Sequence, residues 1–182
     1  RKAERGGLQA GIRTDREAML EFFQLHCRTR RRHGLPPQPL AFFLNIHEEV
    51  IKTGSGFLVM ATDGSVPVAA SIFFHNGAQA IYKFGASDDR VQSLRANNLV
   101  MWHGIRLLAE RGMESLHFGR TSRGNEGLRR YKLAWGTTET SLEYFRFDAR
   151  AGAWAIGRDE AADGFWATLR HASPAGAFVK VD

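Results

Sequence analysis

Two stretches near the start of the chain carry apolar residues with the period of a helix. Thr14 and Glu17 form a capping-box pattern, and apolar residues recur from Met19 onward,. This pattern predicts a helix over residues 15–33, ended by a glycine and two prolines,. A second apolar stripe predicts another helix over residues 39–53,.

The apolar pattern then changes to that of strands. "GFLVMAT" predicts a buried strand, and "VPVAASIFF" and "AIYKF" flank "HNGAQ", which predicts a β-hairpin,. A long helix over 94–112, a strand at "ESLHF", a helix over 125–135 and a strand at "SLEYFRF" follow,. This order predicts an α/β fold with a mixed sheet, an antiparallel hairpin early and a βαβ crossover late. We expect residues 1–182 to form one domain,.

The stretch 148–182 is rich in Ala and Gly and is expected to be a C-terminal tail. Phe165, Trp166 and Leu169 predict one short amphipathic helix within it,. The chain starts at Arg1 rather than Met, so we expect it to be part of a longer protein.

Charge and cysteine content narrow the class of protein only partly. The formal net charge is +6, which fits either a basic surface that keeps the protein in solution or a polyanionic partner,. Such a partner would be a phosphorylated cofactor, a nucleic acid or an anionic lipid. Cys27 is the single cysteine, so no internal disulfide forms, as is usual in a reducing compartment,. We expect a cytoplasmic protein without a membrane-spanning segment, with the inner face of the membrane as a second place of action.

The candidate chemistry gathers in "HFGRTSRGNEGLRRYKLAWG", residues 117–136. On a helix, Lys132 would share one face with Leu128, Tyr131 and Trp135,. Two interpretations stay open. The lysine stem packs on Trp135 with its ammonium in water, or the ammonium faces a cleft and holds a phosphate or carboxylate.

Other residues in the stretch carry weaker signals. Gly119 and Arg120 follow a predicted strand end, where ligands of α/β proteins often bind, but a turn glycine explains the first equally well,. His117 is a candidate general base or a structural histidine,. The arginine run over 28–34 suits a helix C-terminus,. The sequence holds no metal-ligand cluster, nucleophile elbow or phosphate-loop motif, so we expect no metal,.

Five segments together resemble a known family: "TRRRHGLPPQP", "FGASD", "NNLVMWHGIRLLAERG", "HFGRT" and "GLRRYKLAWG". They are similar to the FemAB-like branch of the GNAT acyltransferase superfamily, and most of all to FemAB-related proteins associated with PEP-CTERM exopolysaccharide systems. The resemblance covers about residues 14–147. It implies a GNAT-type fold and transfer of an acyl or aminoacyl group to an amine. Family members usually carry two GNAT-like domains, so this chain is expected to be the C-terminal half, with an N-terminal partner domain missing.

The resemblance also implies site residues. The matching positions are Tyr82, Asn97, Gly119, Arg120, Lys132, Trp135 and Gly136. Lys132 and His117 are the implied catalytic candidates, and the others are the implied substrate-binding residues. Two departures qualify this. Many relatives carry aspartate at the position of His117, and the CoA-binding signature R/Q-x-x-G-x-G/A of ordinary GNAT enzymes is absent after "AIYKFGAS".

Two functions from different classes follow. The first is an N-acyltransferase or aminoacyltransferase that takes its group from acyl-CoA or aminoacyl-tRNA and acts on a peptidoglycan or exopolysaccharide precursor. The alternative is a non-catalytic basic domain that binds RNA, anionic glycan or lipid headgroups. A purely electrostatic binder has no use for a lysine inside an apolar stripe, so Lys132 favours the first,.

Overall fold

A computed structural model describes residues 2–122, 124–143 and 145–156 of the chain. The chain divides into two compact units, Arg1–Gly119 and Arg120–Asp182, and each is described by itself. We call them the first unit and the second unit.

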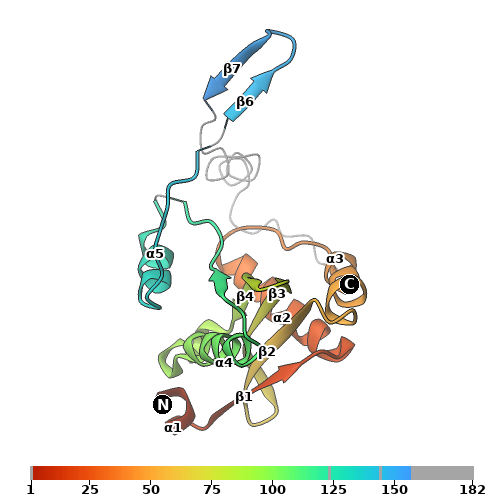
Figure 1. The fold of residues 1–182 in the computed structure, drawn as a ribbon. Coiled ribbons are helices and arrows are strands. Elements are labelled where there is room, and N and C mark those ends of the chain that lie inside the picture. The colour runs from red at the N-terminus through yellow and green to blue at the C-terminus, as the bar shows by residue number, and fades with distance from the viewer. Residues whose placement is uncertain (1, 123, 144, 157–182) are drawn as a thin grey trace. The chain divides into compact units, whose positions relative to one another are not determined.

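The first unit contains a five-stranded sheet with helices around it (Figure 1). Its helical elements are α1 (Lys2–Arg5), α2 (Arg16–Arg32), α3 (Leu40–Ile46), the π-helix η1 (His47–Ile51), the 3₁₀ helix η2 (Asp89–Leu94) and α4 (Ala96–Glu110). Its strands are β1 (Leu8–Arg13), β2 (Gly56–Asp63), β3 (Val66–Asn76), β4 (Gln79–Ser87) and β5 (Ser115–His117).

The strands follow one another in the sheet in sequence order, β1-β2-β3-β4-β5. The first four are antiparallel neighbours, and β5 is parallel to β4. A parallel pair needs a crossover connection, and α4 provides it,. The predicted mixed sheet, with its hairpin and its later βαβ crossover, is therefore confirmed.

The sheet is apolar on both faces, which is why the central strands are continuous hydrophobic runs. Leu58 and Met60 of β2 lie opposite Ile72 and Ala70 of β3, and all four belong to the cluster formed with α2 and α3. The residues between them in the chain point to the opposite face, where α4 packs,. Figure 1 shows α4 on one side of the sheet and α2 with α3 on the other.

Close packing of α4 depends on a glycine. A Cβ atom at Gly104 would lie 2.3 Å from Cζ of Phe73, which is fully buried. The ring of Phe73 stacks on Phe57 with centroids 5.2 Å apart and contacts Tyr82 at 5.7 Å. Helix α4 therefore approaches the sheet directly over an aromatic stack.

Several expected boundaries need correction. The α2 cap is Asp15 rather than Thr14, because the Asp15 carboxylate accepts the N–H of Ala18 at 2.9 Å,. The second predicted helix is split into α3 and a π-helical turn. His26 and His47, which lie on the apolar faces of these helices, are both buried.

The second unit holds α5 (Glu126–Leu133), β6 (Phe145–Asp148) and β7 (Ala153–Ile156). The predicted last strand is shorter than expected, and β6 pairs with β7 in an antiparallel two-stranded sheet. The sequence patterns did not predict α1, β1 or β7. The predicted helix around Phe165 and Trp166 lies outside the described residues.

Candidate functional site

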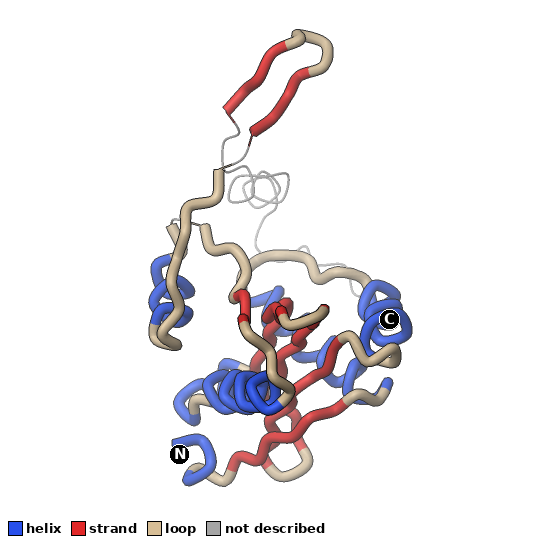
Figure 2. The backbone as a smooth tube through the Cα atoms, viewed as in Figure 1, coloured by secondary structure: helices blue, strands red, loops and turns tan. Residues whose placement is uncertain are grey.

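The edge of β4 beyond its pairing with β5 is the main feature of the first unit. The two strands pair only at Gln79–Ser115, Ala80–Leu116 and Ile81–His117. Among the described residues, no strand lies beside β4 on that side from Tyr82 to Ser87. Figure 2 shows how short β5 is before the chain continues as a loop. A β-bulge at Lys83 bends β4 at the same point, because Phe73 pairs with Tyr82 and Ile72 with Phe84,. We call residues 82–86 the open edge of β4.

Tyr82 lies at the start of this open edge. Its ring contacts Phe73 and Phe118, with centroids 5.7 and 6.1 Å apart. Its hydroxyl lies over Gly85, where an added Cβ would clash directly with it, and is hydrogen-bonded to the side chain of Ser71. Burial raises the pKa of the Tyr82 hydroxyl, so it stays neutral and acts as a hydrogen-bonding group,.

His117 and Gly119 form a tight turn at the end of β5. The N–H of Gly119 donates to Nδ1 of His117 at 3.0 Å, and Gly119 has φ 72°, a conformation suited to glycine,. This bond uses the lone pair on Nδ1, so the neutral ring carries its proton on Nε2. The exposed nitrogen of His117 is therefore a hydrogen-bond donor in this arrangement, which does not suit the base role.

The far end of the open edge is held by side chains of α2 and α4. The N–H of Ser87 donates to the hydroxyl oxygen of Thr29 at 3.0 Å, and that hydroxyl donates to the carbonyl of Ser87 at 3.2 Å. Asn97 donates from Nδ2 to the Ser87 hydroxyl at 3.1 Å. Asn97 therefore supports the strand end, and no sequence pattern indicates the Thr29 contacts.

Asp88 follows β4 and is only 6% exposed. Its carboxylate accepts from Nε of Arg90 at 2.9 and 3.1 Å, from the N–H of Arg90 at 3.0 Å, and from Nη1 of Arg28 at 3.1 Å. The hydrogen bond from Arg90 holds the pKa of Asp88 at about 2, so the carboxylate is charged at neutral pH,. Arg28 and Asp88 are 60 positions apart, so no local pattern indicates the pair.

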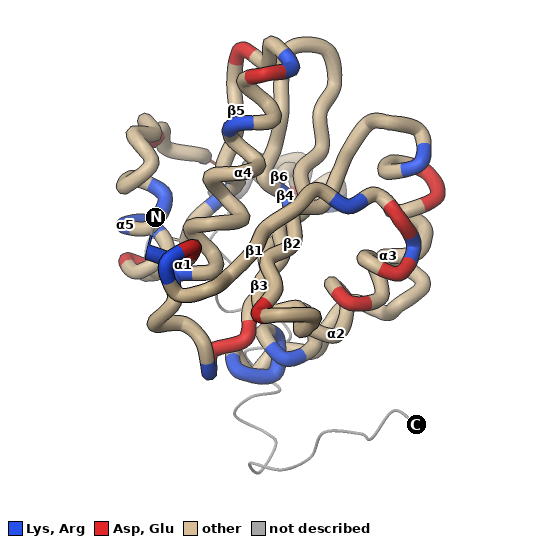
Figure 3. Tube along the Cα trace, turned by 90° about the horizontal axis from the view of Figure 1, so that it is seen from below, with Lys and Arg blue, Asp and Glu red and all other residues tan. Residues whose placement is uncertain are grey.

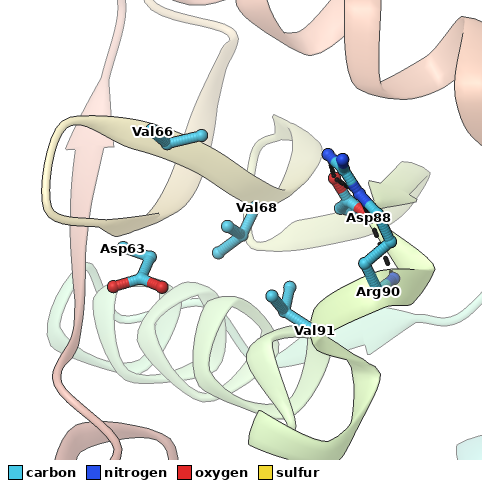
Figure 4. A pocket seen from close by; sticks show the side chains of 6 residues that line it. All are labelled: Asp63, Val66, Val68, Asp88, Arg90 and Val91. Atoms are coloured by element: carbon cyan, nitrogen blue, oxygen red, sulfur yellow. Dashed lines mark hydrogen bonds and ion pairs between the residues drawn. The ribbon is translucent and has the colours of Figure 1, made fainter.

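An open pocket of about 310 Å³ lies beside this ion pair (Figure 4). Its lining combines apolar and charged side chains: Asp63, Val66, Val68, Asp88, Arg90 and Val91. Figure 4 shows Arg90 folded over Asp88 and the Asp63 carboxylate on the other side of the valines. With two carboxylates and one guanidinium, the charged lining is net negative.

In the second unit, Lys132 is buried at 8% exposure, so it is not a surface lysine with its ammonium in water. Its Nζ donates to the backbone carbonyl of Arg120 at 3.0 Å. Burial lowers the pKa of the Lys132 ammonium,. The lysine therefore ties α5 to the segment that precedes it.

The residues around Lys132 shape the two ends of α5. Asn125 caps its start by accepting the N–H of Leu128 at 3.1 Å,. Past the helix, Gly136 has φ 75°, and Trp135 contacts the Tyr131 ring edge-on at 6.4 Å,. Trp135 and Gly136 thus have structural roles at the helix end.

The predicted site residues fall into two groups. Tyr82, Asn97, His117 and Gly119 belong to the first unit and lie on β4, α4 and the end of β5. Arg120, Lys132, Trp135 and Gly136 belong to the second unit. The first group is ordered around the open edge of β4, and the second around α5.

A family model described as an acetyltransferase (GNAT) domain matches residues 1–133. The chain therefore belongs to the GNAT acetyltransferase-domain family, a class of transferase enzymes, and the predicted resemblance and fold class are confirmed. A search of curated proteins found no match.

Solved structures that are similar to this chain include FemX and two N-acetyltransferases. FemX is 16% identical with a TM-score of 0.68, over 75% of this chain and 52% of its own. The aminoglycoside N-acetyltransferase AAC(6')-Iy, in complex with CoA, is 12% identical with a TM-score of 0.62, over 78% of this chain and 95% of its own. The ribosomal-protein-S18-alanine N-acetyltransferase from Escherichia coli is 15% identical with a TM-score of 0.61, over 80% of this chain and 88% of its own. The chain spans about half the length of the FemX chain.

No helix among the described residues is both long and apolar enough to cross a membrane. Within the same residues, no group of three or more His, Cys, Asp or Glu side chains could hold a metal ion.

Proposed function

We propose that this chain is an N-acyltransferase or aminoacyltransferase domain that transfers an acyl or aminoacyl group to an amine. The open edge of β4 carries this proposal. A strand edge without a neighbour offers the backbone N–H groups that point outward from it to a ligand, and such groups can bind the oxygen of an activated carbonyl. Membership of the GNAT family supports the same reaction.

In the proposed reaction, the acceptor amine attacks the carbonyl carbon of the donor. A C–N bond forms, the bond from that carbon to the donor's leaving group breaks, and the proton that the amine loses leaves with that group. N–H groups of residues 82–86 would stabilise the negative charge on the carbonyl oxygen. Tyr82, which lies at the start of the open edge, would contribute its aromatic face. The Nε2–H of His117 would donate a hydrogen bond to the leaving group.

The acceptor we propose is a peptidoglycan or exopolysaccharide precursor. The resemblance of "HFGRT" and "GLRRYKLAWG" to FemAB-like proteins supports it, as does the fold shared with FemX. Partners of this kind imply a cytoplasmic protein that works at the inner face of the membrane. They also imply a second GNAT-like domain and tRNA as a donor carrier. On the same resemblance, Arg120, Trp135 and Gly136 are proposed as substrate-binding residues of the second unit.

The alternative, a basic domain that binds RNA, glycan or lipid, has less support. Positions of Lys and Arg and of Asp and Glu are interspersed along the trace (Figure 3). Arg13, Arg28, Arg90 and Arg129 each form an ion pair with a carboxylate. Arginines held in this way contribute less to a continuous positive surface.

A transfer assay tests the proposal. The full chain is incubated with acetyl-CoA or aminoacyl-tRNA as donor and a UDP-muropeptide as acceptor, and new amide product is measured by mass spectrometry. We expect product with at least one donor. Absence of product with every donor, together with RNA or glycan binding that persists in high salt, would favour the binding domain instead.

Lys132→Met tests the predicted role of Lys132 in the same assay. We expect transfer to fall about a hundredfold if the ammonium contacts substrate. Arg130→Met is the matched control, because Arg130 is an exposed cation on the same helix. If Lys132→Met is fully active and melts normally, Lys132 has no part in the site. A large loss of melting temperature would indicate that the bond to the Arg120 carbonyl is its main role.

A further inference from the structure

The connection between β4 and α4 bears on the identity of the acyl donor. Ordinary GNAT enzymes carry their CoA-binding signature, R/Q-x-x-G-x-G/A, after the strand that corresponds to β4. Glycine-rich turns at a helix N-terminus bind phosphates because their backbone N–H groups are accessible to the ligand. The connection in this chain can therefore be tested for its fit to the diphosphate of CoA.

The connection lacks the glycines of such a turn. No glycine occurs between Gly85 and Gly104, so every residue of the connection carries a side chain. Arg95 stands directly before α4 with φ 61°, a left-handed conformation that usually belongs to glycine,. Its N–H donates to the carbonyl of Gln92 at 3.0 Å, and its own carbonyl accepts the N–H of Asn98 at 3.0 Å. These N–H groups are bonded within the chain.

The hydrogen-bond donors of the connection are already engaged by a side chain of the protein. Asp88 is buried there and accepts one backbone N–H and two guanidinium groups, from Arg90 and Arg28. Backbone N–H groups and guanidinium groups are also the usual partners of a phosphate oxygen. Asp63 adds a second carboxylate to the lining of the neighbouring pocket (Figure 4). An incoming diphosphate would find this N–H and both guanidinium groups already engaged by the Asp88 carboxylate.

We propose that Asp88 is a built-in anion that takes the place of a donor diphosphate at the β4–α4 connection, so that the domain does not use acyl-CoA as its donor. This inference rests on the proposed acyltransferase function, and it narrows the donor class. The donor is then an activated acyl group whose carrier makes no diphosphate contact at residues 88–95.

Asp88→Asn is the decisive variant. Asparagine keeps the size of the side chain and an oxygen for the Arg90 N–H, but it releases the charge that holds Arg28 and Arg90. CoA binding is measured by calorimetry on the full chain. We expect no saturation for the original chain at about 1 mM CoA, and affinity at least about tenfold higher for Asp88→Asn. Asp89→Asn, which removes the adjacent exposed carboxylate, should leave CoA binding unchanged.

Several outcomes would overturn the inference. Binding of CoA by the original chain at micromolar concentration would do so, as would a folded Asp88→Asn variant with no gain, or an equal gain in Asp89→Asn. If Asp88→Asn does not fold, inorganic pyrophosphate is titrated into the original chain and the backbone amide signals of Arg90 and Arg95 are followed by NMR. Unchanged signals support the inference, and saturable shifts overturn it.

The transfer assay separates this inference from the proposed function. Product formed from acetyl-CoA would refute the role of Asp88 while leaving the acyltransferase function intact. Absence of product from any donor would refute the function, and the CoA-binding difference between the two asparagine variants would still be measurable.

Discussion

Gly104→Ala should destabilise the first unit even though alanine is the better helix former. The new Cβ would lie 2.3, 2.5 and 3.0 Å from three carbons of the Phe73 ring, and the first two distances are shorter than those of real Cβ contacts. The ring has little room to retreat, because it is fully buried, stacks on Phe57 and contacts Tyr82. Either α4 or the aromatic stack must therefore shift.

The magnitude follows from two opposing effects. Replacing a helical glycine by alanine gains about 1 kcal/mol of helix stability. Overpacking a core costs about 1–3 kcal/mol, and the rings on both sides of Phe73 favour the upper end,. We expect a net loss of about 2 kcal/mol in the free energy of unfolding, and a fall of roughly 5–10 °C in melting temperature.

Urea unfolding at constant m-value measures this loss. Gly11→Ala is the control in the same unit, because nothing lies within 4 Å of its added Cβ, and it should stabilise slightly,. Phe73→Leu makes room for the methyl group, so in the double variant Gly104→Ala should cost about 1 kcal/mol less than it does alone. If Gly104→Ala is as stable as Gly11→Ala, or if the two changes are additive, the close approach of α4 is refuted.

Three further predictions follow from contacts in the first unit. Thr29→Val should cost about 1–3 kcal/mol in unfolding free energy, because both backbone groups of Ser87 lose their partner; denaturation with Thr29→Ser as control checks this,. Burial lowers the pKa of His26 in the folded chain below its ordinary value of 6.5. Below about pH 6.5 the unfolded chain therefore takes up a proton that the folded chain does not, and the free energy of unfolding should fall as the pH decreases towards the folded-state pKa of His26. Urea midpoints at pH 7.5 and 5.5 should show a smaller decrease for His26→Gln, and an unchanged decrease would exclude His26 as a source. Replacing Arg31 and Arg32 together by Ala should leave small-ligand binding within about threefold, since both are exposed at the end of α2, and a larger loss in calorimetry would place them in a site,.

Much of the fold could be predicted because the apolar period changes at the right places. The α2 stripe and the continuous apolar strand "GFLVMAT" are long, local signals,. The capping residue was placed one position early, since Thr14 and Asp15 are both good caps. The choice depends on Arg13, which holds the Asp15 carboxylate at 2.6 and 2.7 Å. β1 was missed because "LQAGIR" is a short edge strand with a glycine at its centre,.

The candidate site could be predicted only where neighbours in sequence are neighbours in space. Helical spacing placed Lys132 beside Tyr131 and Trp135, but not its bond to the carbonyl of Arg120, 12 positions earlier. The Asp88 cluster depends on Arg28 of α2, and three strands, β2, β3 and β4, lie between the two residues in the sequence. Contacts of this kind are decided by how α2 docks on the sheet.

The two hydrogen bonds between Thr29 and Ser87 also limit self-association. An exposed strand edge is a template on which a second chain can add a strand, and long open edges promote aggregation. At Ser87 one hydroxyl replaces the donor and the acceptor that a neighbouring strand would supply. The edge that remains, from Tyr82 to Ala86, is bent by the bulge at Lys83. The molecule can thus keep a strand edge accessible to a ligand while offering another copy of itself a segment too short and too bent to extend a sheet.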